Sequence, residues 1–133
     1  MSIQYSVSTQ LREQRGDELY KDLKVYQRSY KLAISLYKFA GTMPKEERYG
    51  LTSQIKRAAT SIPLNIAEGY GKHDTNAEIK RYLRMAKGSC NELDILIEMC
   101  KDLNFIEKSA CEKYVNEIQE IGAMLYGLMK SLN

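Results

Sequence analysis

The stretch from Glu47 to Gly71, ERYGLTSQIKRAATSIPLNIAEGYG, constrains the fold more than any other part of the chain. Its apolar residues recur at steps of three and four, the period of one face of an α-helix. We predict a helix from Pro44, which suits a first helical position, to about Tyr70, where two glycines end it. A bend is expected near Pro63, because proline removes one backbone donor and crowds the preceding turn. The apolar face consists of Ile55, Ala58, Ala59, Ile62 and Ile66.

Three further segments show the same periodicity. The first runs from about Asp22, a candidate cap, to Ala40. Another follows Thr75-Asn76-Ala77-Glu78, which has the spacing of a capping box, and extends to about Leu103. The last runs from about Glu107 to Ser131, with Ser109-x-x-Glu112 as a second possible box. Four long amphipathic helices with short connections predict an all-α fold, an antiparallel up-down-up-down four-helix bundle. The inner stripe of the third helix is Ile79, Leu83, Ala86, Cys90, Leu93, Ile97 and Cys100.

The first twenty residues differ from the rest of the chain. Ile3, Tyr5 and Val7 alternate with polar residues, a weak strand-like pattern, and charged residues follow. We predict a flexible N-terminal arm over residues 1–20 and a single bundle domain over residues 21–133. The alternative is that the arm lies extended on a neighbouring subunit. The N-terminus has no apolar signal region and no apolar run reaches membrane-spanning length, so we expect a cytoplasmic protein without a membrane partner.

The residues that catalytic and metal sites need are scarce. The one histidine, His73, lies in a predicted loop, so the Glu-x-x-His pairs of di-iron bundles are missing. The sequence has no phosphate-binding Walker loop and no haem-attachment motif. The three cysteines form no Cys-x-x-Cys pair, which indicates reduced, buried thiols. We therefore expect no enzymatic activity, cofactor or metal ion.

Charge is unevenly distributed along the chain. Residues 56–87 carry seven Lys/Arg and three Asp/Glu, whereas residues 88–133 carry four and eight. This asymmetry suggests either a surface for a polyanion or head-to-tail assembly. A patch on one side of the bundle would bind RNA or DNA phosphates, with affinity that falls as salt rises. The alternative is solvated cations paired with neighbouring acids. The candidate nucleic-acid-binding residues are Lys56, Arg57, Lys72, Lys80, Arg81, Arg84 and Lys87.

A stripe of polar side chains follows the second predicted helix. Arg57 and Glu68 are too far apart to pair, about 16 Å along a helix axis. Each is therefore expected to find a partner on another helix, another subunit or a ligand. We favour a role in fixing the packing or the subunit interface, with a small ligand or RNA pocket as the alternative. The stripe consists of Gln54, Arg57, Ser61, Asn65 and Glu68.

Tyrosine dominates the aromatic composition, with ten Tyr, two Phe and no Trp. The apolar arc of the first helix is wider than one partner helix needs, and its surplus is mainly tyrosine. Tyrosine is favoured where one side packs and the other is wet, as at subunit contacts. We predict an oligomer interface at Tyr26, Tyr30 and Tyr37.

Three segments together resemble a known family: DLKVYQRSYKLAISLY, PKEERYGLTSQIKRAATSIPLNIAEGYGK and EIKRYLRMAKGSCNELDILIE. They are similar to the four-helix-bundle proteins encoded in intervening sequences of bacterial 23S ribosomal RNA genes. The resemblance covers about Asp22 to Ser131. The chain departs from it at Tyr26, where relatives usually have Trp, and at Leu64, where many have a small polar residue.

This family is in turn similar to the accessory variability determinant proteins of diversity-generating retroelements. The resemblance implies a homopentamer that acts as an accessory protein and binds RNA or DNA through basic surfaces. It also implies a protein partner such as a reverse transcriptase. It implies no catalytic reaction.

Overall fold

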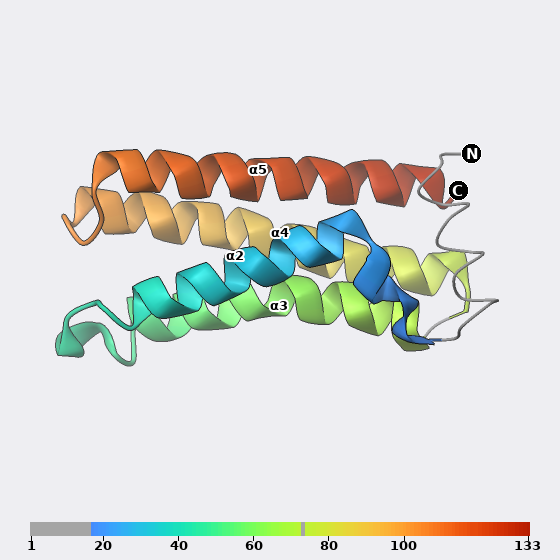
Figure 1. The fold of residues 1–133 in the computed structure, drawn as a ribbon, viewed down its shortest axis with the longest axis horizontal. Coiled ribbons are helices and arrows are strands. Elements are labelled where there is room, and N and C mark those ends of the chain that lie inside the picture. Colours follow the sequence, from blue (N-terminus) through green and yellow to red (C-terminus); the bar gives the residue numbers. More distant parts are fainter. Residues whose placement is uncertain (1–16, 73) are drawn as a thin grey trace.

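The structure, a computed structural model, describes residues 17–72 and 74–133, and these residues form helices and connections without a strand. The four long helices are α2 (Lys24–Ala40), α3 (Leu51–Lys72), α4 (Asn76–Asp102) and α5 (Lys108–Ser131). Two short 3-10 helices, η1 (Asp17–Asp22) and η2 (Lys45–Glu47), precede α2 and α3. The long helices lie side by side, with the α2–α3 and α4–α5 connections at one end of the molecule (Figure 1). The predicted all-helical bundle of four long helices is therefore confirmed.

The core forms where the apolar stripes of the helices meet. All seven residues of the stripe predicted for α4 are buried, and so are all five apolar residues predicted for α3. The closest packing joins helices that are successive in sequence, whereas α2 and α5 touch over a smaller area. The side of the bundle between α2 and α5 is therefore its most open side.

Helix starts differ from the predictions in three places. Leu23, without a side-chain bond, occupies the N-cap of α2, so Asp22 is not its cap. Residues after Pro44 form the separate turn η2, so α3 begins at Leu51 and not at Pro44. Glu107 is extended and caps α5, which places Ser109 inside the first turn and rules out the second capping box.

Thr75 caps α4 as predicted. Its hydroxyl accepts a hydrogen bond from the Glu78 backbone N–H at 3.2 Å, which satisfies one of the free donors at the helix start. Pro63 is buried inside α3, which continues through it to Lys72. The bend expected at Pro63 stays a prediction.

Most of the predicted N-terminal arm lies outside the described residues, and so does His73. The last residues assigned to that arm belong to η1, which packs against α3 and α2. Leu19 is buried there. No helix among the described residues has the length and apolar character to cross a membrane.

The three cysteines are free and buried, as predicted. Burial raises the pKa of Cys90 to about 12 and that of Cys100 to about 11, because it disfavours the thiolate. Burial also raises the pKa of Cys111. The thiols are therefore protonated and unreactive in the folded protein at neutral pH.

We predict that iodoacetamide at pH 8 labels the cysteines of the native protein at least about 100-fold more slowly than those of the unfolded protein. A raised thiol pKa contributes stability below the ordinary pKa, and that stability is lost as pH rises toward the folded-state value. The free energy of unfolding should fall above about pH 9, by about 1.4 kcal/mol per pH unit for Cys90. Equal labelling rates in the two states, measured by mass spectrometry, would contradict the burial of these thiols.

Candidate nucleic-acid interface

One part of the predicted basic patch stays together on α4. Lys80, Arg84 and Lys87 follow one another at helical spacing on the side of α4 that meets α5. The Lys80 Nζ contacts Asn133 Oδ1 just after α5. The Lys87 side chain crosses to Gly122 of α5, where an added Cβ would lie 3.5 Å from its Nζ. We call Lys80, Arg84 and Lys87 the α4 row.

The α4 row keeps its positive charge. Lys87 donates to an amide oxygen, Asn91 Oδ1, at 3.4 Å, and the Lys80 contact is also to an amide. None of the three cations forms an ion pair with a carboxylate in the described part of the chain. The row is therefore a line of three positive groups whose charge no carboxylate neutralises in the described residues.

The other cations of the predicted patch point elsewhere and are mostly paired. Arg57 pairs with Glu92 of α4 at 2.7 Å. Lys72 and Arg81 pair within their own helices, with Glu68 at 3.4 Å and Glu78 at 3.6 Å. These exposed pairs contribute little stability, but they reduce the local charge. The structure therefore separates the α4 row from the rest of the patch.

Lys56 lies on a different side of α3 from Arg57. Its Nζ is 4.4 Å from the centre of the Tyr37 ring on α2, whereas Arg57 faces α4. A single surface of seven cations is therefore not formed in one chain.

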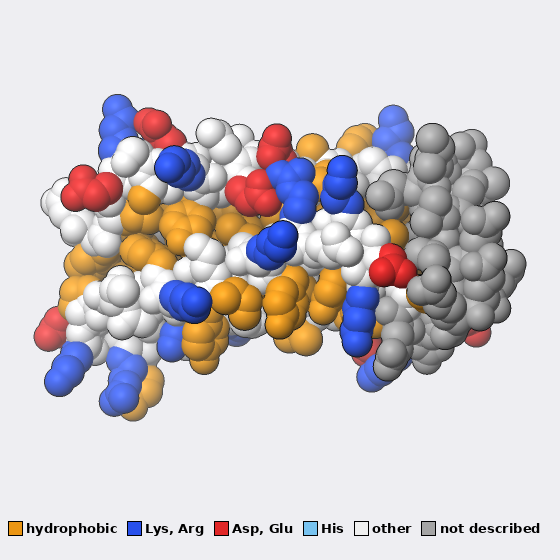
Figure 2. All heavy atoms as spheres, in the orientation of Figure 1, with side chains coloured by type: hydrophobic (Ala, Val, Ile, Leu, Met, Phe, Trp, Pro, Cys, Tyr) orange, Lys and Arg blue, Asp and Glu red, His pale blue; other side chains and the backbone are white. Residues whose placement is uncertain are grey.

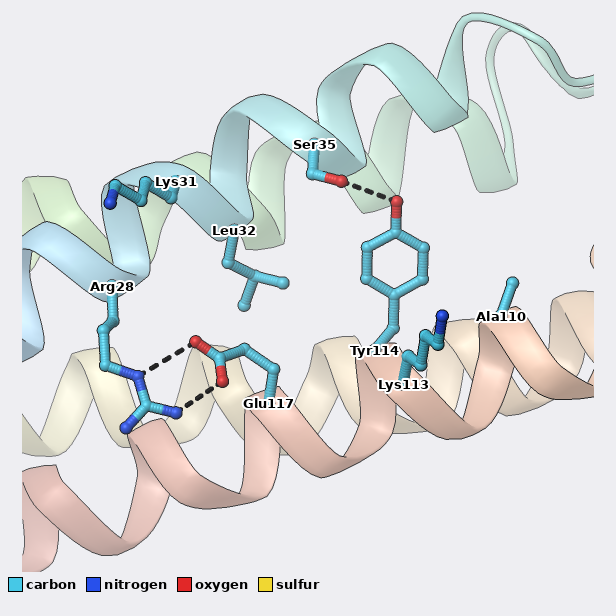
Figure 3. A pocket seen from close by; sticks show the side chains of 8 residues that line it. All are labelled: Arg28, Lys31, Leu32, Ser35, Ala110, Lys113, Tyr114 and Glu117. Atoms are coloured by element: carbon cyan, nitrogen blue, oxygen red, sulfur yellow. Dashed lines mark hydrogen bonds and ion pairs between the residues drawn. The ribbon is translucent and has the colours of Figure 1, made fainter.

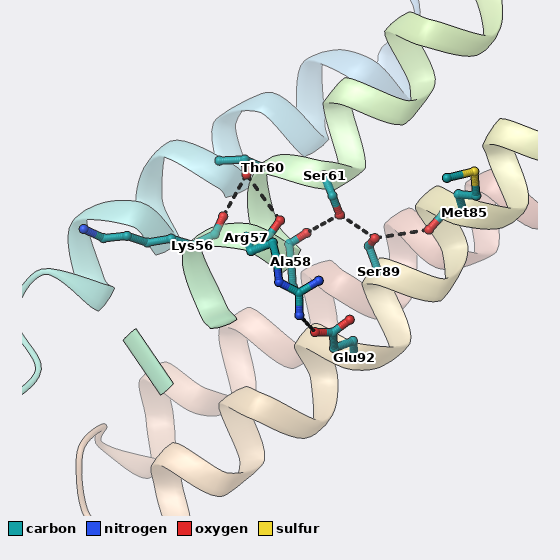
Figure 4. A network of polar contacts seen from close by, with 8 residues as sticks. All are labelled: Lys56, Arg57, Ala58, Thr60, Ser61, Met85, Ser89 and Glu92. Carbon is teal, nitrogen blue, oxygen red and sulfur yellow. Dashed lines mark hydrogen bonds and ion pairs between the residues drawn. The ribbon is translucent and has the colours of Figure 1, made fainter. Parts of the chain in front are cut away.

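Two members of the predicted polar stripe, Arg57 and Ser61, face α4 (Figure 4). The Ser61 hydroxyl contacts the Ser89 hydroxyl of α4 and donates to the Ala58 carbonyl at 3.0 Å. Ser89 in turn donates to the Met85 carbonyl at 3.1 Å. The Asn65 amide donates to the Ser61 carbonyl at 2.8 Å. These bonds are made within the bundle, which supports the packing role over a ligand pocket.

Two members of the stripe do not join this network. Gln54 is exposed to solvent. Glu68 was expected to find its partner on another helix, another subunit or a ligand, but it pairs with Lys72 one turn further along α3. The prediction for Glu68 was wrong because it overlooked Lys72, a cation four residues along the same helix and therefore close enough to pair.

The tyrosines predicted at an interface differ in burial. Tyr26 is half-buried, with its ring centre 5.0 Å from that of Tyr20. Tyr30 is 52% exposed and Tyr37 is 50% exposed, and Ile34 between them is 45% exposed. These last three residues form an apolar line on the outer side of α2, which we call the α2 stripe.

Sequence reasoning missed a second row of cations. Lys24, Lys31 and Lys38 are exposed and recur every seven residues along α2, which contains no acidic residue. That spacing was visible in the sequence. Sequence reasoning also missed Tyr126, which is 55% exposed and lies one turn beyond Gly122, where Lys87 rests.

The family model for the 23S rRNA-intervening sequence protein matches residues 21–127. The chain belongs to this family. The match confirms the resemblance to intervening-sequence proteins, whereas the relation to retroelement accessory proteins stays a prediction.

One solved structure similar to this intervening-sequence protein comes from Bacteroides thetaiotaomicron VPI-5482, a protein with unknown function from the S23 ribosomal protein family. The two are 24% identical, with a TM-score of 0.74 over 80% of this chain and 95% of the other. At this identity the likeness shows the fold alone. None of the curated proteins matches the chain.

The most open side of this family member is a groove of about 460 Å³ between α2 and α5. A hydrophobic strip lies between these helices (Figure 2), with Leu32 in the groove wall. Arg28 crosses one end: its Nε donates to Glu117 Oε2 at 3.1 Å, and its guanidinium also contacts Glu120. Ser35 and Tyr114 share a hydrogen bond of 2.7 Å across the other end (Figure 3).

These bonds hold the two helices together where their packing is least extensive. The hydrogen bonds that Arg28 donates to Glu117 and Glu120 raise its pKa, so it stays charged at any accessible pH. Its charge is balanced by the two carboxylates. Polar contacts therefore join α2 and α5 across an apolar groove. None of the predicted nucleic-acid-binding residues lines this groove.

Proposed function

We propose that this antiparallel up-down-up-down bundle is a non-enzymatic, oligomeric accessory protein that binds RNA or DNA through the phosphates. The single observation that carries the proposal is the α4 row, three aligned cations without a carboxylate partner among the described residues. Such a row meets phosphates by charge and has no means of reading base sequence. It therefore favours recognition of strand shape, with structured RNA as the first candidate.

The family description adds support, because these proteins are named for an intervening sequence of 23S rRNA. The resemblance to retroelement accessory proteins extends the proposal to a homopentamer with a protein partner such as a reverse transcriptase. Repetition of the α4 row around a ring would raise the local positive potential and the affinity for a polyanion. The proposed compartment is the cytoplasm.

The test compares two triple variants that remove equal charge. Lys80→Gln/Arg84→Gln/Lys87→Gln should weaken binding of a labelled RNA stem-loop roughly 100-fold at about 50 mM salt, because three phosphate contacts are lost. The control, Lys24→Gln/Lys31→Gln/Lys38→Gln, removes three exposed cations from α2 and should change affinity less than about threefold. Fluorescence anisotropy measures both. Equal effects of the two variants would show that net charge, and not the α4 row, governs binding.

A second candidate function is a protein-interaction scaffold whose charge asymmetry serves only subunit assembly. A specific observation favours it: the α2 stripe lies on a helix that also carries the exposed Lys24, Lys31 and Lys38. A matching exposed line lies in the net negative third of the chain: Ile95 and Met99 of α4, and Leu103 directly after it. Contact between two different surfaces of this kind is head-to-tail, and such contacts form a ring when the rotation between successive subunits closes.

Ile34→Glu is expected to break this assembly, because it places a charge in the centre of the α2 stripe. Light scattering of the native chain should give about 77 kDa for five subunits of 15.3 kDa, and the variant should give the monomer. Leu64→Glu, at an exposed position of α3 away from the stripe, is the control and should leave the mass unchanged. A native chain that is monomeric at micromolar concentration contradicts both oligomeric proposals.

A further inference from the structure

A second hollow lies at the end of the bundle, beside the connection between α2 and α3. It encloses about 360 Å³, within the size range of small-ligand sites. One wall is apolar and comes from the turn after α2, and the other carries cations from η2 and α3. Its lining residues are Ala40, Gly41, Met43, Pro44, Lys45, Arg48, Thr52 and Lys56.

The charge of this hollow is positive and unpaired. Lys45, Arg48 and Lys56 form no ion pair among the described residues. Lys56 lies over the Tyr37 ring, and the Arg48 guanidinium is 5.9 Å from the Tyr49 ring centre. Aromatic rings orient cations without neutralising them. The acids between Lys45 and Arg48 in the chain do not line the hollow.

Thr52 adds a second, independent feature. Its hydroxyl oxygen is buried and has no hydrogen-bond partner among the residues that the structure describes. A buried hydroxyl without a hydrogen-bond partner destabilises the fold, so a ligand that supplied an acceptor for it would bind favourably. Thr52 is also the second residue of the 22-residue helix α3. The first turn of α3, the positive end of its dipole, therefore borders the hollow.

We propose that this hollow binds a phosphate monoester. The three cations and the first turn of α3 would hold the phosphate group. Thr52 would donate to it after its side chain rotates into the hollow, because its hydroxyl oxygen is covered by protein in the unliganded chain. The apolar wall formed by Met43 and Pro44 would contact the organic group that carries the phosphate. The site does not depend on the α4 row, and it gives Lys45 and Arg48 a role that the sequence did not suggest.

The first test is isothermal titration of the full chain at low salt with adenosine 5′-monophosphate, adenosine and inorganic phosphate. We expect saturable binding of the two phosphates and none of adenosine. Lys45→Gln/Arg48→Gln should weaken phosphate binding about tenfold or more. Lys31→Gln/Lys38→Gln, on the exposed side of α2, is the charge-matched control and should keep the native affinity. Binding of adenosine equal to that of the monophosphate, or equal loss in both double variants, overturns the proposal.

Thr52→Val tests the hydroxyl without altering charge. The variant should bind phosphate about tenfold more weakly and unfold at the same or higher temperature in the absence of ligand. Unchanged affinity overturns the role of Thr52.

A second comparison identifies the source of the phosphate, with a 5′-phosphorylated tetranucleotide and the same tetranucleotide with a 5′-hydroxyl. Tighter binding of the phosphorylated form assigns the site to an RNA end. Equal binding of the two assigns it to a free phosphorylated molecule. The α4-row variant should keep phosphate binding, so failure of the nucleic-acid proposal and failure of this site are distinguishable.

Discussion

Gly69→Leu should lower the free energy of unfolding by about 3 kcal/mol, because it forces apart the two helices with the most extensive contact. A Cβ at Gly69 would lie 3.1 Å from the Tyr82 Cβ and 3.4 Å from the Ile79 carbonyl oxygen of α4. Neither atom is the end of a flexible side chain, so a larger residue has to displace the α4 backbone. Chemical denaturation monitored by circular dichroism measures the change.

Gly127→Leu is the matched control. Gly127 also lies inside a helix, but a Cβ there would meet no heavy atom within 4 Å. Leucine has the higher helix propensity, so this variant should be neutral or more stable by up to about 1 kcal/mol. Equal destabilisation by both substitutions would mean that α3 and α4 do not approach closely at Gly69.

Leu83→Ala should cost about 3 kcal/mol of unfolding free energy. The Leu83 side chain is fully buried on the inner face of α4, and truncation there leaves a cavity in addition to the lost burial. The same denaturation measurement applies, with an unchanged denaturant slope for a two-state transition.

Met85→Ala, two residues along α4, is the control for Leu83→Ala. Met85 is 48% exposed, so its truncation should change stability by less than about 0.5 kcal/mol. A larger loss at Met85 than at Leu83 would show that α4 presents a different face to the core.

The packing of this bundle was predictable because burial follows helical period. The seven residues of the α4 stripe recur at alternating steps of four and three, which place them on one face of a helix. Thr75 was predictable as a cap because its partner, the Glu78 N–H, is three residues away. The core stripes and this cap were therefore predicted correctly from local spacing, whereas the equally local pair of Glu68 and Lys72 was missed.

Helix starts depended on more than local spacing. Pro44 has suitable geometry for a first helical residue, yet the chain after it makes one 3-10 turn and then begins α3 at Leu51. Ser109 has a glutamate at the right distance, but Glu107 is the residue in extended conformation. These shifts, about two turns at Pro44 and less than one turn at Ser109, depend on how each connection crosses the end of the bundle, which the local sequence pattern does not encode.

The candidate site was only partly predictable for the same reason. The α4 row is local to one helix, and its members remain together. Whether Arg57 joins them depends on Glu92, which lies 35 residues away and becomes a neighbour only when α3 packs on α4. Lys56 lies against α2, where its ammonium group makes a cation–π contact with the Tyr37 ring. The number of charges along the sequence predicts neither of these two contacts.

The central claim is that the α4 row holds nucleic-acid phosphates. Its most direct test is the dependence of RNA affinity on salt for the native chain and for Lys80→Gln/Arg84→Gln/Lys87→Gln. If each cation neutralises one phosphate, the slope of log K against log salt should become shallower by about 2 to 3, because each lost contact contributes roughly 0.7 on a single strand and roughly 0.9 on a duplex. No binding by the native chain at low salt, or the same slope for both proteins, would contradict the claim.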